Sequence, residues 1–192
     1  MANDTNSRTI RVGLLGCGNV GGALVPLIEQ QADMIEARTG LRLEVVRVAV
    51  RNVSRDRGIT FEDGVLTRDV HAVVADPDID LIVEVIGGIE PARELIMAAL
   101  AAGKPVVTGN KELLANVGAE LFAAADSYGV DLLFEAAVAG GIPLIRPLRE
   151  SLREKRPESW TLSVDEAYGF LREVGPLLER SGFGVLVPPW WN

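Results

Sequence analysis

Short apolar runs alternate with longer stretches of helical spacing along the first two thirds of the chain. The apolar runs are of strand length and rich in β-branched residues, which predicts β-strands. They cover residues 9–15, 41–50, 81–86, 105–108 and 130–135. The helical spacing predicts helices at residues 19–38, 67–75, 91–102 and 111–128. A further helix is predicted to begin near Gly141, whereas the polar segment 52–64 is predicted as a loop.

The predicted strands are apolar almost throughout, as in strands that are buried on both faces. Strands of this kind that alternate with helices form a parallel sheet with helices packed on both of its faces. The fold class predicted for residues 1–152 is therefore α/β, with a doubly wound parallel sheet.

The composition changes after about residue 152. All three tryptophans (Trp160, Trp190 and Trp191) and four of the ten prolines lie beyond this point. The sequence there predicts a polar linker, an amphipathic helix and a short apolar run, at residues 153–159, 164–180 and 183–187. Such a tail is too short for a second domain of ordinary size, so residues 153–192 are predicted to form a linker and a short C-terminal appendage.

Charge and rare residues narrow the classes of partner. With 19 Lys and Arg against 27 Asp and Glu, the formal net charge of −8 weighs against nucleic acid or an anionic membrane surface. One Cys excludes a disulfide within the chain, and one His argues against a zinc or iron enzyme. A polar start and the lack of an apolar run of about 20 residues predict neither a signal peptide nor a membrane span, and hence a cytoplasmic protein.

The segment GCGNVG, residues 16–21, follows the first predicted strand and precedes the first predicted helix. Its G-x-G-x-x-G spacing permits a tight turn, close approach of the backbone to a pyrophosphate, and close packing of helix on strand. The helix N-terminus adds N–H groups and a positive dipole end for the phosphates. In this context the motif predicts a Rossmann-like NAD(P)-binding domain rather than a merely flexible turn. Cys17 within it admits a redox role, but a packing role is favoured because the chain has no second thiol.

The end of the second predicted strand bears on the choice of dinucleotide. An acidic residue there binds the ribose 2′-hydroxyl of NAD, whereas an arginine suits the 2′-phosphate of NADP. Arg51 lies at this point and is followed by Arg55 and Arg57, and the first acid is Asp56. NADP is therefore predicted in preference to NAD. The alternative is that these arginines form a solvated loop face.

Ligands of an open α/β sheet gather at the carboxyl ends of its strands, where two further segments lie. Gly87 and Gly88 close the third predicted strand, where they either admit a flat ring such as nicotinamide or only end the strand. Lys111 begins the helix after the fourth predicted strand, although helix dipoles favour cations at C-termini. A local rule broken at a ligand-facing end suggests function. Lys111 is therefore a candidate to hold a substrate carboxylate or carbonyl or to relay a proton; the alternative is an ordinary exposed lysine.

Glu135 lies at the end of the fifth predicted strand, before a loop that contains Gly140 and Gly141. A carboxylate and free backbone carbonyls are oxygen ligands that suit a hard cation. From the residues alone, a solvated or helix-capping glutamate is equally plausible.

Five motifs in a fixed order give the chain a resemblance to a known family: GCGNVG, AVR, EVIGGIEPA, VVTGNKELLA and FEAAVAGGIPLI. Together they resemble the N-terminal half of homoserine dehydrogenase, over about residues 9 to 152. The resemblance implies an oxidoreductase for the NAD(P)-dependent interconversion of L-homoserine and L-aspartate 4-semialdehyde, in the branch that leads to threonine and methionine. It implies a small-molecule substrate as partner and leaves a homo-oligomer open.

The resemblance also assigns site residues. The motif glycines Gly16, Gly18 and Gly21 are cofactor-binding candidates already. The further positions that match the family's nucleotide contacts are Cys17, Asn19, Val20, Arg51, Gly87, Thr108 and Lys111. Lys111 is in addition the candidate catalytic residue. The positions that match the family's monovalent-cation loop, which holds sodium, are Glu135, Val138, Gly140 and Ile142. Gly109 stands where the family usually has Ala, and Ala139 where it usually has Gly; both are small residues.

After residue 152 the resemblance stops. The family continues there into a substrate-binding region with an Asn-Gly-Thr motif, which residues 153–192 do not show. A truncation or a change of reading frame would produce such a stop. Because hydride transfer needs the substrate held against the nicotinamide, the chain is predicted to bind nucleotide with little or no turnover. The alternative function is a non-catalytic nucleotide-binding or interaction module that docks a partner through its tryptophan-rich tail.

Overall fold

The chain divides into two units, Met1–Val138 and Ala139–Asn192, in a computed structural model that describes residues 7–138, 163, 168–170 and 172. Residues 168–170 and 172 are helical and lie inside the helix predicted over 164–180. The helix predicted near Gly141, the linker, the apolar run and the tryptophans lie outside the described residues. The sheet and its helices belong to the first unit.

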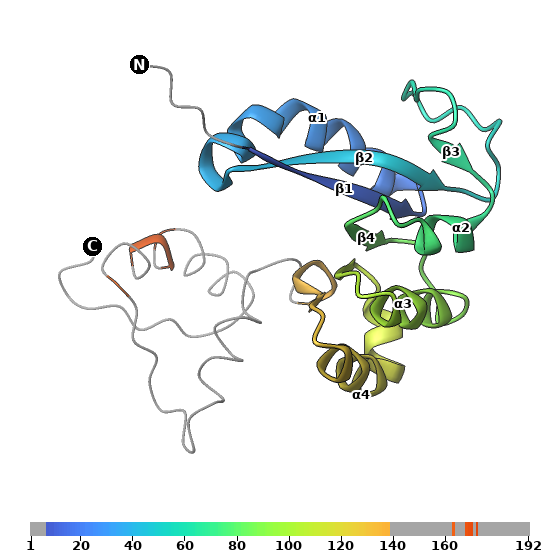
Figure 1. The fold of residues 1–192 in the computed structure, drawn as a ribbon, viewed down its shortest axis with the longest axis vertical. Helices are drawn as coiled ribbons and strands as arrows, with labels where there is room; N and C mark the ends of the chain where they lie inside the picture. Colours follow the sequence, from blue (N-terminus) through green and yellow to red (C-terminus); the bar gives the residue numbers. More distant parts are fainter. Residues whose placement is uncertain (1–6, 139–162, 164–167, 171, 173–192) are drawn as a thin grey trace. The chain divides into compact units, whose positions relative to one another are not determined.

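Six parallel strands form one sheet in the order β3-β2-β1-β4-β5-β6 (Figure 1). They are β1 (Arg8–Leu15), β2 (Leu41–Ala49), β3 (Leu66–Thr67), β4 (Leu81–Glu84), β5 (Val106–Thr108) and β6 (Leu132–Leu133). The order reverses between β1 and β4, because β2 and β3 lie on one side of β1 and the later strands on the other. Ligands of such sheets bind in the crevice at this switch point, outside the carboxyl ends of the strands. The predicted α/β fold class is confirmed.

Helices cover both faces of this sheet. In the first unit they are α1 (Asn19–Thr39), α2 (Val70–Ala75), α3 (Ala92–Ala101) and α4 (Lys111–Tyr128). Val12 and Leu14 of β1 pack in one core cluster with Val25 of α1. Leu15 belongs to a second cluster, which includes Leu95 of α3 and residues of α2 and α4. Figure 1 shows α1 along β1 and β2, and α3 beside α4. Side chains on both faces of β1 are therefore buried, which explains its apolar run.

Two predicted elements differ in kind from the structure. The segment 67–75, predicted as one helix, contains the last residue of β3 and all of α2. The Val50 N–H bonds the Thr67 carbonyl at 2.8 Å, and Asp69 caps the helix at the Ala72 N–H. A strand of two residues has no periodicity from which to predict it. The strand predicted over 130–135 is only β6, and a 3₁₀ turn, Glu135–Ala137, follows it.

The other elements predicted within the described residues are confirmed to within two residues at each end. The helix α4 begins and ends where it was predicted, because Asn110 caps its start and Gly129, with φ of +66°, ends it in the left-handed conformation. None of the helices in the described part of the chain is both long and apolar enough to span a bilayer.

Candidate functional site

A tight turn joins β1 to α1 at the carboxyl edge of the sheet. Gly16 has a φ of +101°, and a Cβ atom on it would lie 2.9 Å from the Val85 carbonyl oxygen. A Cβ atom on Gly21 would lie only 2.3 Å from the Gly16 carbonyl oxygen, whereas one on Gly18 would meet no atom within 4 Å. The fold itself therefore requires two glycines of the motif, and the third leaves open space beside the turn.

The N-terminus of α1 is available to an anion. Its N-cap, Gly18, provides no side-chain hydrogen bond, and the first turn contains no acidic residue. The Gly22 N–H bonds the Gly18 carbonyl at 2.8 Å, so the preceding N–H groups lack partners within the helix. Asn19 and Val20 are exposed. Their N–H groups and the positive end of the helix dipole favour a phosphate at this point.

Arg57 ties the loop after β2 to the glycine turn. Its Nε donates a hydrogen bond to the Cys17 carbonyl oxygen at 3.4 Å. Its terminal nitrogens donate to the carbonyl oxygens of Arg55 and Asn52, each at 2.7 Å. Arg51 and Arg55 are exposed, and among the described residues no hydrogen bond or ion pair engages either guanidinium. Of the three arginines noted in the sequence, Arg57 therefore stabilises the loop by binding backbone carbonyl oxygens. The side chains of Arg51 and Arg55 remain available to a ligand.

Cys17 is buried at the turn. Burial raises the pKa of its thiol, against a smaller opposing influence of Arg57. A covered thiol that stays protonated is a poor nucleophile. The structure thus favours the packing role of Cys17 over a redox role.

A buried carboxylate that the sequence analysis missed lies at the end of β4. Glu84 is fully buried, and its Oε1 accepts hydrogen bonds from the N–H groups of Ile86 at 2.7 Å and Gly87 at 3.3 Å. Its Oε2 accepts a hydrogen bond from the Thr108 hydroxyl at 2.6 Å. These bonds turn the chain two residues earlier than the predicted strand end. A lone acid within an apolar strand was the sequence signal that could have revealed it.

Asn110 extends this network from β5 to α4. Its N–H donates to Thr108 Oγ1 at 3.1 Å, and its side-chain amide donates to the Gly88 carbonyl oxygen at 2.7 Å. Its Oδ1 accepts from the Leu113 N–H at 3.1 Å and so caps α4. Gly87 and Gly88 have φ of +83° and +74°, a conformation that favours glycine. The network therefore fixes the turn after β4 against the turn after β5.

Lys111 is the first residue of α4 and is exposed at the same edge. Among the described residues no hydrogen bond or ion pair engages its ammonium group. Glu112 in the first turn supplies the negative charge that the helix dipole favours there. The predicted position of Lys111 is confirmed, and it does not serve the stability of the helix.

Two of the four predicted cation ligands fall within the described residues. Glu135 opens the 3₁₀ turn after β6, and the Val138 N–H donates to the Glu135 carbonyl oxygen at 3.2 Å. Gly140 and Ile142 lie outside the described residues. Within the described ranges, no three His, Cys, Asp or Glu side chains gather as a metal site. A cation here would therefore depend on one carboxylate and on backbone carbonyls.

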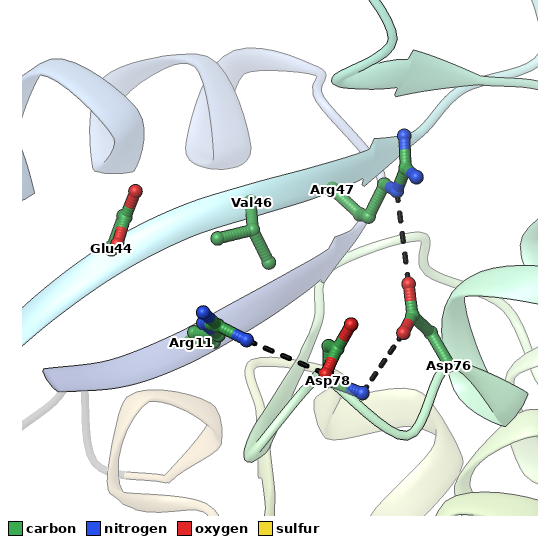
Figure 2. A pocket seen from close by; sticks show the side chains of 6 residues that line it. All are labelled: Arg11, Glu44, Val46, Arg47, Asp76 and Asp78. Atoms are coloured by element: carbon green, nitrogen blue, oxygen red, sulfur yellow. Dashed lines mark hydrogen bonds and ion pairs between the residues drawn. The ribbon is translucent and has the colours of Figure 1, made fainter.

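A separate cleft lies on the face of the sheet beside the turn between α2 and β4 (Figure 2). It is lined by Arg11, Glu44, Val46, Arg47, Asp76 and Asp78. Arg11 pairs with Asp78 at 3.5 Å and Arg47 with Asp76 at 3.8 Å, as Figure 2 shows. Both arginines are thus matched by carboxylates, and none of the predicted site residues lines the cleft. The candidate site remains the carboxyl edge of the sheet.

Comparison with known families matches the part of the chain that forms this edge. The family described as "Homoserine dehydrogenase, NAD binding domain" matches residues 16–135. A second family, described as "SNF2 Helicase protein", matches residues 155–192 and shares no residue with the first.

Individual relatives cover the same region. Homoserine dehydrogenase of Mycobacterium tuberculosis is 49% identical over 147 residues, which are 77% of this chain and 33% of that protein. The Bacillus subtilis enzyme is 42% identical over 149 residues, 78% of this chain and 34% of that protein. The chain spans about a third of the length of these relatives.

Solved structures agree with the fold. The crystal structure of a homoserine dehydrogenase from Thiobacillus denitrificans matches with a TM-score of 0.69 and 52% identity, over 76% of this chain and 34% of that one. A hyperthermophilic archaeal homoserine dehydrogenase in complex with NADPH matches with a TM-score of 0.61 over 87% of this chain and 61% of that one. At 21% identity, the archaeal structure shows a likeness of fold alone.

Proposed function

The chain belongs to the homoserine dehydrogenase family through its NAD-binding domain, and on this premise we propose that it binds a nicotinamide dinucleotide, NADP in preference to NAD, across the carboxyl ends of β1, β4 and β5. The observation that carries the proposal is the glycine turn at the uncapped N-terminus of α1, beside the switch point. In sheets of this kind such a turn holds a pyrophosphate.

The residues at the turn fit the dinucleotide. Gly18 carries no side chain into the space beside the turn, and no acid opposes a phosphate in the first turn of α1. The residues that would hold the pyrophosphate with their backbone N–H groups are Cys17, Gly18, Asn19, Val20 and Gly21. Gly16 would shape the turn around it, because its own N–H bonds the Ala49 carbonyl oxygen at 3.0 Å. Arg51 supports the preference for NADP, because its guanidinium is exposed at the end of β2 and is engaged by no other described residue.

The ends of β4 and β5 would hold the nicotinamide half, through Gly87, Thr108 and Lys111. Thr108 is fully buried with its hydroxyl bonded to Glu84, so its part would be that of the backbone. When bound, the nicotinamide supplies the hydride that is exchanged with a substrate. The exposed ammonium of Lys111 suits a substrate carboxylate or a proton relay. The substrates that family membership supports are L-homoserine and L-aspartate 4-semialdehyde.

We propose a sodium ion as the second ligand, held by Glu135 and by backbone carbonyls that include those of Val138, Gly140 and Ile142. Thermal unfolding in sodium chloride and in choline chloride at equal ionic strength tests it. We expect sodium to raise the unfolding temperature of the wild-type chain but not of Glu135→Gln. Equal unfolding temperatures of the wild-type chain in both salts would remove the cation from the proposal.

Calorimetric titration of the 192-residue chain with NADPH and with NADH tests the main proposal. We expect NADPH to bind more tightly than NADH. NADP-dependent oxidation of L-homoserine by the same preparation should be slow or absent, because the resemblance to the dehydrogenase stops after residue 152, before the family's substrate-binding region. Failure to bind either nucleotide would overturn the proposal and leave the interaction module. Rapid oxidation of homoserine would overturn only the expected lack of turnover.

The variant Gly18→Asp separates binding from folding. Its Cβ would meet no atom within 4 Å, and aspartate is a favourable N-cap, so the chain should keep or gain stability. Its carboxylate would take the place of the phosphate at the α1 N-terminus, so NADPH affinity should fall at least about tenfold. Unchanged NADPH affinity in this variant would exclude the α1 N-terminus from the site.

A further inference from the structure

Glu84 lies at the carboxyl edge of the sheet, and its side chain is fully buried. It is the last residue of β4, the strand beside β1 at the switch point, and its register partners are Leu15 and Thr108. Its two carboxylate oxygens accept three hydrogen bonds, from two backbone N–H groups and one hydroxyl. Three donors directed at one side chain satisfy the ionised carboxylate, which is an acceptor only.

The hydrogen bonds beyond Glu84 have a fixed direction. Thr108 Oγ1 accepts the Asn110 N–H at 3.1 Å, and its own proton is directed to Glu84 at 2.6 Å. The Asn110 side chain then reaches the Gly88 carbonyl. A neutral amide in place of the carboxylate would present an N–H group to either the Thr108 hydroxyl or the turn N–H groups, and would break the sequence of donors and acceptors.

The negative charge of Glu84 has no matching cation. Among the described residues no ion pair engages it, although a buried carboxylate is costly and is usually paired with a cation. The three hydrogen bonds explain how the protein tolerates this charge. The charge also acts on any ligand bound at the same edge of the sheet. An oxidised nicotinamide ring is positively charged, whereas the reduced ring is neutral.

We propose that Glu84 is a positioning residue that sets the preference of the site for the oxidised over the reduced dinucleotide. It holds the turns 86–88 and 108–110 at one spacing, and it places a fixed negative charge at the nicotinamide side of the switch point. The inference rests on the proposed function, because it needs a nicotinamide dinucleotide at this edge. In a poorly polarisable site such a charge changes the affinity for a cation strongly and the affinity for its neutral form weakly.

The experiment compares the dissociation constants of NADP+ and NADPH for the wild-type chain and for Glu84→Gln. We expect the ratio Kd(NADP+)/Kd(NADPH) to rise about tenfold in the variant, the size of effect produced by a unit charge about 10 Å away at an effective dielectric constant of about 20. Glu44→Gln removes an equal charge from an exposed position in β2 and should leave the ratio unchanged. An equal ratio in Glu84→Gln and the wild-type chain would overturn the inference.

Two further variants distinguish the charge from the scaffold. Thr108→Val removes the hydroxyl but keeps the Glu84 charge, so both dinucleotides should lose affinity in parallel with the ratio unchanged. Glu84→Asp keeps the charge on a shorter side chain and replaces Glu84→Gln as the test if that variant does not fold. The ratio Kd(NADP+)/Kd(NADPH) of Glu84→Asp should equal that of the wild-type chain, and a different ratio would overturn the inference. Failure of the wild-type chain to bind either dinucleotide would overturn the proposed function itself, and the inference with it.

Discussion

The two halves of the candidate site are built in different ways. At the β1–α1 turn the site consists of backbone: Gly16 and Gly21 are required by close contacts, and Gly18 leaves the helix N-terminus open. At the ends of β4 and β5 it consists of buried side chains, with Glu84 and Thr108 at its centre. The first half depends on glycines, which have no side chain. The second half depends on polar side chains that form hydrogen bonds with one another.

The two halves also differ in charge. The first offers N–H groups, a helix dipole and the exposed guanidinium of Arg51, all of which suit anions. The second contains the buried carboxylate of Glu84 behind the turn at 86–88. A nicotinamide dinucleotide has the complementary arrangement, with an anionic pyrophosphate at its middle and, at one end, a ring that becomes cationic on oxidation. The difference in charge between the two halves therefore matches a difference in charge between two parts of the ligand.

The largest effect is expected where the backbone half is most crowded, in Gly21→Ala. The new Cβ would lie 2.3 Å from the Gly16 carbonyl oxygen, so the turn or the helix must move. We expect the free energy of unfolding to fall by about 3 kcal/mol or more and NADPH binding to be lost. Chemical denaturation and calorimetry measure the two effects.

The neighbouring variant Gly22→Ala is the matched control for this prediction. Its Cβ would lie 3.9 Å from Ile59 Cδ1, an ordinary contact, and alanine is the better helix former. Stability should be unchanged or rise by up to about 1 kcal/mol. If Gly21→Ala were as stable as Gly22→Ala, the close packing of α1 on the turn would not be what the motif glycine provides.

The side-chain half is tested next by Asn110→Ala. This variant loses the cap of α4 and leaves the half-buried Gly88 carbonyl without its donor. We expect the free energy of unfolding to fall by about 2 kcal/mol. Asn116→Ala is the control, because Asn116 is exposed and only its amide bonds the Glu112 carbonyl within the same helix. A loss in Asn110→Ala no greater than in Asn116→Ala would mean that the network does not hold the two turns.

The two halves also differ in how far the sequence predicts them. The turn and the helix α1 were predicted because glycine spacing is a local signal, and α4 because Asn110 and Gly129 mark its ends. The bond from Thr108 to Glu84 joins residues 24 positions apart, and the bond from Arg57 to the Cys17 carbonyl joins residues 40 apart. Such bonds form only when the strands are aligned, so no local sequence pattern predicts them.

The predicted arginines illustrate the same limit. The sequence places Arg51, Arg55 and Arg57 together after β2, but it does not show which of them the protein needs for itself. Only the structure separates Arg57, with three bonds to backbone carbonyls, from its two neighbours. In the same way, β3 was missed because its two residues are held by bonds to β2 rather than by a pattern of their own.

A smaller effect, confined to binding, is expected for Arg51→Asp. The guanidinium is exposed and unengaged by described residues, so the free energy of unfolding should change by less than about 0.5 kcal/mol. NADPH affinity should fall about tenfold while NADH affinity stays level or rises. Arg38→Asp, an exposed change in the last turn of α1, controls for net charge. An unchanged preference for NADPH in Arg51→Asp would exclude Arg51 from the 2′-phosphate site.

The smallest effect on stability is expected for Lys111→Gln, and its sign is the informative part. A cation at the first position of α4 opposes the helix dipole, so removing it should raise the free energy of unfolding by about 0.5 kcal/mol while nucleotide affinity falls.

Lys104 provides the contrast, because its buried ammonium donates to the Val74 and Asp76 carbonyl oxygens at the end of α2. Lys104→Gln should lower the free energy of unfolding without weakening nucleotide binding. If Lys111→Gln lowered stability instead, Lys111 would be a structural lysine like Lys104, and the side-chain half of the site would lose its only exposed cation among the described residues.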